Sequence, residues 1–115
     1  MMILQKLKYT IKDDLQLAEK YFSIISILND MSLAKREIQL LALTSVKGNI
    51  GNDRTKEEFV KVYGSSLATV GNIITKLTKK RLLVRDGKTI SINEGLKINF
   101  KDDVTLAITL EHKKL

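Results

Sequence analysis

The sequence feature that most constrains the fold is a pair of helix starts separated by one glycine. Thr55 and Glu58 have the spacing of a capping box, in which each side chain satisfies the backbone N–H of the other residue. Gly64 permits the positive φ of a tight turn, and Ser66 is a favourable residue for the start of a second helix. Two short helices joined by such a turn form a helix-turn-helix, which we expect over residues 55–81.

A β-hairpin is predicted directly after these helices. Two short runs of strand-favouring residues, Leu82–Arg85 and Lys88–Ile92, stand on either side of Asp86-Gly87. An Asp-Gly pair between such runs is a strong signal for a type I′ turn. We therefore expect residues 82–93 to form a hairpin beside the two helices, which we call the wing.

The helix that follows Ser66 has two different sides. At helical spacing its larger apolar residues fall together, and we expect them in the core: Val70, Ile73, Ile74 and Leu77. Small, polar and basic residues dominate the outward side, which consists of Leu67, Ala68, Gly71, Asn72, Thr75, Lys76 and Lys79. This division predicts a helix that presents one face to a partner.

The run from Val62 to Lys88 resembles the winged helix-turn-helix superfamily of DNA-binding regulators. The shared order of residues is a turn glycine, a capping Ser, then Thr-Val, Asn-Ile-Ile, and Lys-Leu before a basic pair and a hydrophobic strand. With a helix expected at Leu33–Lys47, the resemblance covers about residues 33–95. The pairs Ile92-Asn93 and Gly95-Leu96 also resemble small winged-helix proteins of phages and plasmids. The resemblance implies an α+β winged helix-turn-helix fold that binds DNA.

Two features depart from the pattern of that superfamily. Arg81 stands where a helix-ending glycine is usual, which predicts a helix that ends less sharply or extends further. The outward side of the preceding helix also has few side chains able to make bidentate contacts with base edges. Most of the expected affinity for DNA is therefore electrostatic.

The remaining elements are predicted from periodicity and capping. Alternation of apolar and polar residues predicts a strand at each end of the chain, within residues 1–12 and 103–111. Helices are expected at Leu15–Asn29, capped by Asp13 or Asp14, and at Leu33–Lys47, capped by Ser32 and ended by Gly48. The polar residues that follow, 48–54, are expected to form a loop whose first four residues are a flexible turn.

These elements predict one α+β domain over residues 1–115. Its helical part is residues 13–81 and its wing is residues 82–93, and the two terminal strands form a small accessory sheet. The length of 115 residues is that of a single domain.

The net charge of +7 is concentrated in one segment. Residues 1–53 carry seven basic and six acidic side chains, residues 54–101 carry eleven and four, and residues 102–115 carry two and three. A localised basic surface favours a polyanionic partner, and nucleic acid is the commonest. An anionic membrane or an acidic protein comes next, and charge alone does not choose among the three. Together with the resemblance, the charge predicts double-stranded DNA as the partner.

Nine residues are candidates for contact with DNA. Asn72 is suited to adenine, and Ala68 or Thr69 to a thymine methyl group. The basic side chains are suited to phosphates. Residues 66–79 are expected in the major groove, and residues 85–88 on the backbone or in the minor groove. The full set is Ser66, Ala68, Thr69, Asn72, Thr75, Lys76, Lys79, Arg85 and Lys88.

The sequence gives no indication of catalysis. The absence of Cys excludes disulfides, thiolate zinc sites and cysteine nucleophiles. His112 is the one histidine and has no Ser and Asp arrangement near it. The adjacent acidic pairs suit helix starts and turns. We therefore expect no enzyme, no cofactor and no metal site.

Membrane association is not expected either. No apolar run approaches the roughly 20 residues of a membrane span, and residues 1–11 lack the apolar core of a signal peptide. These features predict a cytoplasmic protein, or one in the host cytoplasm or virion if a phage encodes it.

Self-association is predicted from the ends of the chain. The terminal strands and the broad apolar arc of the first helix favour a homo-oligomer, with a dimer as the default. An alternative function is that of a non-catalytic assembly or adaptor protein, for example a phage virion component. Leu67, an apolar residue on the outward side of its helix, would suit such a role.

Overall fold

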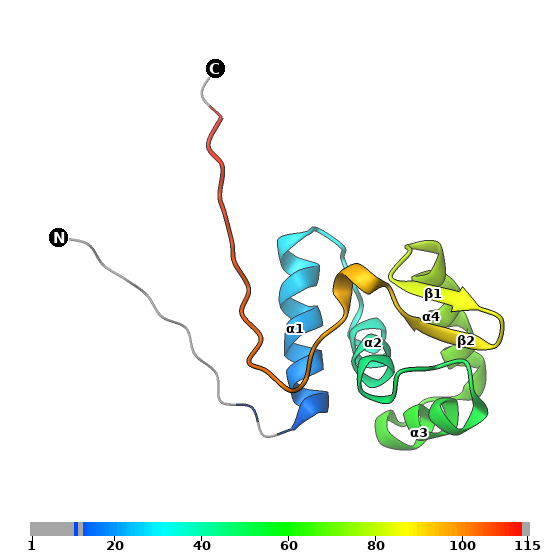
Figure 1. The fold of residues 1–115 in the computed structure, drawn as a ribbon. Coiled ribbons are helices and arrows are strands. Elements are labelled where there is room, and N and C mark those ends of the chain that lie inside the picture. The colour runs from blue at the N-terminus through cyan, green and yellow to red at the C-terminus, as the bar shows by residue number, and fades with distance from the viewer. Residues whose placement is uncertain (1–10, 12, 114–115) are drawn as a thin grey trace.

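Helices form the body of the protein, and a small antiparallel hairpin packs against them (Figure 1). The computed structural model describes residue 11 and residues 13–113. In this part of the chain the elements are α1 (Asp14–Leu28), α2 (Lys35–Lys47), α3 (Asp53–Tyr63), α4 (Leu67–Lys79), β1 (Leu83–Asp86), β2 (Thr89–Ile92) and a 3-10 turn at Glu94–Leu96. The predicted α+β class is therefore confirmed.

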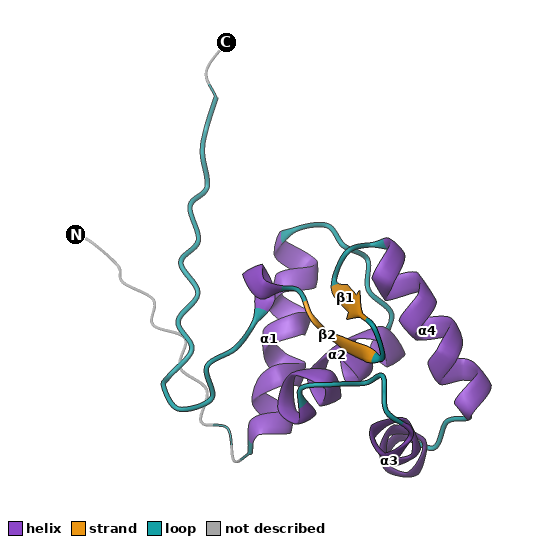
Figure 2. Cartoon of the chain, turned by 45° about the vertical axis from the view of Figure 1, so that its right-hand side comes forward, coloured by secondary structure: helices purple, strands orange, loops and turns teal. Residues whose placement is uncertain are grey.

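The core surrounds α2. Both views of the chain place α2 between α1 and the α3–α4 pair (Figures 1 and 2). Five consecutive residues of α2, 40–44, are buried, and Phe22 of α1 and Phe59 of α3 pack into the same cluster. The inner side of α4 is buried as predicted, at Val70, Ile73, Ile74 and Leu77.

Several helix ends lie where the sequence predicts them. The carboxylate of Asp13 accepts the backbone N–H of Gln16 at 2.8 Å and begins α1. Gly48 ends α2 at φ 87°, and Gly64 ends α3 at φ 63°, both in the left-handed region that glycine adopts without strain. The two short helices on either side of Gly64 are thus confirmed as α3 and α4.

The starts of α2 and α3 differ from the prediction. Ser32 has a positive φ of 50° and does not cap α2, which begins after Ala34. The helix α3 begins two residues before Thr55, because the Asn52 side chain accepts the backbone N–H of Thr55 at 2.8 Å. Asn is a stronger cap than Thr, so Asn52 defines the first turn and Thr55 is buried inside it.

The end of α4 is sharp, contrary to the prediction from Arg81. Arg81 itself adopts the left-handed conformation at φ 63°. The N–H of Leu82 donates to the carbonyl of Leu77 at 3.0 Å, and the N–H of Arg81 donates to that of Thr78 at 3.1 Å. This pair of bonds is a Schellman motif, which ends a helix at once. The amide of Asn93 also donates to the Arg81 carbonyl at 2.8 Å and holds the residue in place.

The predicted hairpin is confirmed, with a turn shifted by one residue. Asp86 pairs with Thr89, so the turn residues are Gly87 and Lys88 rather than Asp86 and Gly87. Gly87 has a positive φ of 61° and Lys88 does not. Positive φ at the first turn residue alone is typical of a type II′ turn, not the predicted type I′.

The predicted flexible turn at residues 48–51 is instead docked on β2. The N–H of Ile50 donates to the carbonyl of Ile90 at 2.9 Å, and the Ile50 side chain is fully buried. The Asn49 side-chain oxygen accepts two backbone N–H groups, from Gly51 at 2.7 Å and from Ile90 at 2.9 Å. This segment therefore fixes the hairpin against the helices.

The predicted accessory sheet is not present in the part of the chain that is described. Residues 103–111 run extended but form no strand there, because strand pairing needs a second strand to complete its hydrogen bonds. Their predicted partner at residues 1–12 lies outside the described residues apart from Ile11, which is in no strand.

Replacement of Gly51 by Ala should destabilise the fold. A Cβ atom at Gly51 would overlap the backbone carbonyl oxygen of Lys88, so the hairpin must shift. We expect a loss of about 1–3 kcal/mol in the free energy of unfolding, measured in urea.

The matched control is Gly71→Ala. Gly71 lies in α4 with no atom near its would-be Cβ, so the change should stabilise the protein by about 1 kcal/mol. Equal unfolding curves for the two variants would contradict the docking of residues 49–51 on β2.

Candidate nucleic-acid interface

The helix α4 presents an exposed face opposite its buried one. The seven residues predicted on its outward side are all exposed: Leu67, Ala68, Gly71, Asn72, Thr75, Lys76 and Lys79. The other predicted contact residues, Ser66, Thr69, Arg85 and Lys88, are exposed too. All nine predicted contact residues are thus accessible to a partner.

Three hydroxyl groups of this face already have local hydrogen bonds. Ser66 accepts the backbone N–H of Thr69 at 3.2 Å, which caps α4, and donates its hydroxyl to the Thr69 side-chain oxygen at 2.9 Å. Thr75 donates to the Gly71 carbonyl at 3.0 Å. Ser66 and Thr75 can therefore act toward a ligand only as acceptors unless these bonds break.

Asn72 is the polar residue of α4 best placed for recognition. It lies at the middle of the exposed face, one turn after Ala68 and nearly one turn before Thr75. Within the described part of the chain its amide has no hydrogen-bond partner. Both its donor and its acceptor are thus available for a bidentate contact.

Four cationic side chains of α4 and the hairpin have no acidic partner in the described residues. Lys76 and Lys79 project from the last turns of α4, and Lys88 lies in the hairpin turn. Arg85 is on β1, directly opposite Ile90 and on the same side of the hairpin as that buried residue. Residues 13–113 contain no acidic side chain within ion-pair distance of these four, so their charges are available to an external anion.

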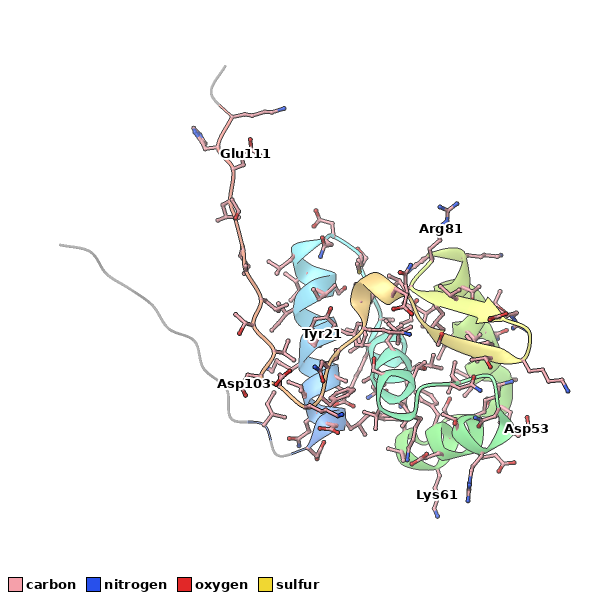
Figure 3. All side chains as sticks on the ribbon, viewed as in Figure 1. Tyr21, Asp53, Lys61, Arg81, Asp103 and Glu111 are labelled. Carbon is pink, nitrogen blue, oxygen red and sulfur yellow. The ribbon has the colours of Figure 1, made fainter. Side chains whose placement is uncertain are left out.

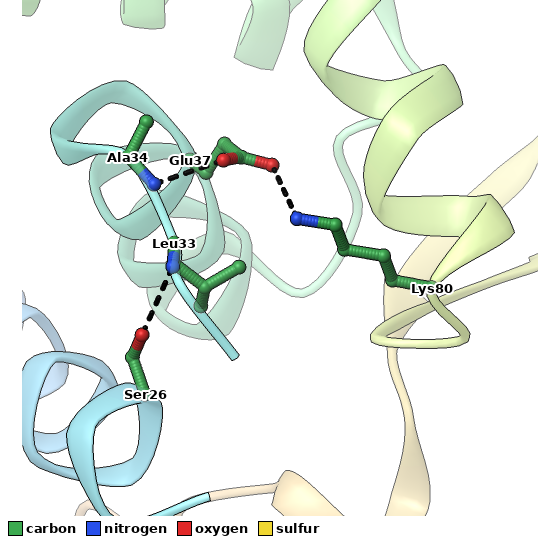
Figure 4. Close-up of polar contacts among 5 residues, drawn as sticks. All are labelled: Ser26, Leu33, Ala34, Glu37 and Lys80. Carbon is green, nitrogen blue, oxygen red and sulfur yellow. Dashed lines mark hydrogen bonds and ion pairs between the residues drawn. The ribbon is translucent and has the colours of Figure 1, made fainter. Parts of the chain in front are cut away.

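Lys80 differs from these four because it is paired. Its ammonium group lies 3.5 Å from a carboxylate oxygen of Glu37, which is buried (Figure 4). The second oxygen of Glu37 accepts the backbone N–H of Ala34 at 2.9 Å and so begins α2. Glu37 therefore joins the start of α2 to the end of α4.

A second contact in Figure 4 anchors the same junction to α1. The buried Ser26 oxygen accepts the backbone N–H of Leu33 at 3.1 Å. Sequence reasoning missed Glu37 and Ser26. The available signal for Glu37 was its place in the first turn of α2, where a Glu reaches back to the start of a helix.

Arg81 adds a basic group that was not among the predicted contacts. Figure 3 shows its side chain pointing away from the body at the end of α4, whereas Lys61 points away from α3 on another side. The exposed Arg81 guanidinium extends the basic surface from α4 toward β1.

The C-terminal end of α3, which leads into α4, is tied to α1. The Tyr63 hydroxyl donates to the Glu19 carboxylate at 2.6 Å. Burial, followed by this hydrogen bond and the charge of Glu19, raises the pKa of Tyr63 far above its usual value. The phenol therefore remains protonated and keeps donating to Glu19 at neutral pH.

The described residues form a small cleft beside α2. A cleft of about 190 Å³ between α2, β2 and Lys97 is smaller than the roughly 300–1,000 Å³ of usual ligand pockets. Residues 11 and 13–113 contain no group of three or more His, Cys, Asp or Glu side chains close enough to hold a metal ion. No helix of this part of the chain has the length and hydropathy to cross a membrane.

Comparison with known proteins adds no relative. The chain matches no model of a protein family, and neither a curated protein nor a solved structure matches it.

Glu37→Ala should lower the free energy of unfolding by about 1–2 kcal/mol, because it removes the group that satisfies the Ala34 N–H. Lys80→Ala should cost less than about 1 kcal/mol, because the Lys80 side chain is 44% exposed and its ion pair is solvated. Glu37→Gln keeps an acceptor, so its loss of unfolding free energy should lie between those of Lys80→Ala and Glu37→Ala. Chemical denaturation of the three variants measures this order, and a larger loss for Lys80→Ala would contradict it.

Proposed function

We propose that this protein is a winged helix-turn-helix DNA-binding protein that acts in the cytoplasm as a transcriptional regulator. In this proposal α4 is the recognition helix and enters the major groove, and the β1–β2 hairpin is the wing that contacts the backbone or the minor groove. No catalytic step is assigned to it. The partner is double-stranded DNA.

The observation that carries the proposal is the contrast between the two faces of α4. Its inner face is buried in the core, while its outer face and the hairpin expose four cations that have no acidic partner in the described residues. Cations that serve only solubility are usually interspersed with acidic side chains. Here Asp86 is the one acidic residue between Ser65 and Asn93.

Base recognition in this proposal depends mainly on Asn72. A bidentate contact between an Asn amide and the major-groove edge of adenine uses one donor and one acceptor, both of which Asn72 has available. Ala68 and Thr69 supply methyl groups that suit thymine. The short side chains around Asn72, including Gly71, allow the helix to approach the floor of the groove closely.

The same residues determine how strongly the proposed protein binds preferred and unrelated duplexes. One bidentate reader contributes limited discrimination, whereas four cations release several counterions from DNA. The proposed protein therefore binds most duplexes at low salt and prefers particular sites by a modest factor.

Salt dependence tests the phosphate contacts. If Lys76, Lys79, Arg85 and Lys88 each neutralise one phosphate, the logarithm of the binding constant falls against the logarithm of salt with a slope of about −3.6 per subunit. Lys79→Ala or Lys88→Ala should each make that slope shallower by about 0.9 and weaken binding to unrelated duplexes equally.

Lys101→Ala is the matched control, because Lys101 is exposed but lies in the turn at residues 99–102, beyond the 3-10 turn and outside the proposed interface. Its slope should equal that of the unmodified protein. No association with duplex DNA at low salt, or slopes unchanged in the two interface variants, would overturn the proposal.

Asn72→Ala tests the base contact separately. It should weaken binding to a selected preferred site by about 5- to 150-fold and leave the affinity for unrelated duplexes unchanged. Selection from a random duplex library followed by fluorescence anisotropy measures both quantities. An equal loss on all duplexes would assign Asn72 to backbone positioning instead of base recognition.

A second candidate function is favoured by exposed apolar residues near the turn between α3 and α4. Leu67 is 56% exposed and Val62 is 51% exposed. An assembly or adaptor protein would use such residues to bind another protein. In that case Leu67→Ser would abolish partner binding, whereas DNA would show no salt-dependent association.

A further inference from the structure

The C-terminal segment carries an apolar face that the described part of the chain covers only in part, since Val104 and Leu106 are half-buried. Residues 104–110 alternate apolar and smaller or polar side chains, and they run extended without a paired strand in the described part of the chain. Ile108 is 57% exposed and Leu110 is 91% exposed. An extended segment with unpaired backbone groups and an apolar face is a surface that favours strand pairing.

The charges at the two ends of this segment specify how it pairs. Asp102 and Asp103 precede the apolar residues, whereas Lys113 follows them. If two copies of the segment pair antiparallel about Ile108, Asp103 of one copy lies opposite Lys113 of the other. Leu106 then lies opposite Leu110, and Ile108 lies opposite itself.

Other pairings of two copies are less favourable. A parallel pairing in register would place Asp103 opposite Asp103 and Lys113 opposite Lys113, and like charges across a strand pair are destabilising. An antiparallel pairing about Ala107 would place Asp103 opposite Glu111. A shift by one residue from the Ile108 register would move the apolar residues of one strand to the wrong face.

We propose that residues 103–113 of two copies of this chain pair antiparallel about Ile108 and form a two-fold homodimer. Each backbone then completes hydrogen bonds that the described part of one chain does not supply. The two apolar faces join into one row on the same side of the ribbon.

This row has an apolar surface to pack against. A two-stranded ribbon alone is only marginally stable, so it needs a further contact. Ile27 and Leu28 at the end of α1 are 76% and 45% exposed. Both views place the segment on the α1 side of the body (Figures 1 and 2), so the exposed end of α1 offers an apolar cover on that side.

The proposed dimer leaves the basic surface open. Figure 3 shows Asp103 and Glu111 on the far side of α1 from Arg81. Pairing of the segments therefore does not cover α4 or the hairpin. The dimer forms without DNA, so its test is independent of the proposed DNA binding.

Cysteine cross-linking tests the register, since the chain has no native Cys. Ile108→Cys places two thiols opposite each other, and mild oxidation should convert most of the protein to a disulfide-linked dimer. Leu106→Cys is the control, because two copies of residue 106 would lie about 13 Å apart along the ribbon, beyond the reach of a disulfide. Equal cross-linking of the two variants would overturn the register.

Light scattering without DNA tests the dimer itself. We expect the unmodified chain to show twice its single-chain mass of 13.0 kDa. Asp103→Lys should raise the dissociation constant by about 10-fold or more, because it creates two symmetry-related Lys–Lys pairs. Adding Lys113→Asp should restore the dimer.

Two results would overturn this proposal. One is a mass of 13.0 kDa for the unmodified chain, which would be expected if the segment pairs with residues of its own N-terminus. The other is a dimer whose dissociation constant is unchanged by Asp103→Lys, which would place the interface elsewhere.

Discussion

The burial of α2 is the constraint on which the other elements depend. Residues 40–44 of this helix are buried on every side, and α1, α3, α4 and β2 all pack against it. Thr44 is part of this run without leaving an unpaired polar atom, because its hydroxyl donates to the Leu40 carbonyl at 2.7 Å. Each of the other elements therefore needs only one apolar face. As a result, α4 can expose its second face to solvent.

The exposed face of α4 has a fixed orientation because the helix is held at its end as well as along its inner face. Lys80 pairs with Glu37, and the Arg81 carbonyl accepts from Asn93. These contacts come from α2 and from the residue after β2. The basic residues of α4 and of the hairpin are thus carried by elements that are fixed to each other at the end of α4, and in the proposed function no further segment has to become ordered for them to contact phosphates.

Local signals in the sequence were sufficient for much of the fold. Gly48, Gly64 and Ser66 act through their own backbone or through residues three positions away, and the inner face of α4 follows from helical spacing. The exposure of the candidate residues on α4 was predictable for the same reason, whereas their contact with DNA stays a prediction. Two contacts were missed for different reasons: another residue competed for the helix cap, or the two partners lie far apart in the sequence. Asn52 displaced Thr55 as a cap, and the pairing of Lys80 with Glu37 depends on residues 43 positions apart.

Strand formation is the feature of this fold that sequence periodicity predicts least well. Residues 49–51 have no alternating pattern, yet they bond to β2 because Asn49 and Ile50 meet its unpaired edge. Residues 104–110 have the clearest alternation in the chain and form no strand, because no described edge lies beside them. Alternation determines which face of an extended segment is apolar, whereas a strand forms only where a second backbone supplies the hydrogen bonds. For the C-terminal segment that second backbone has to be sought outside the described fold, and the opposite charges at its two ends favour another copy of the same segment.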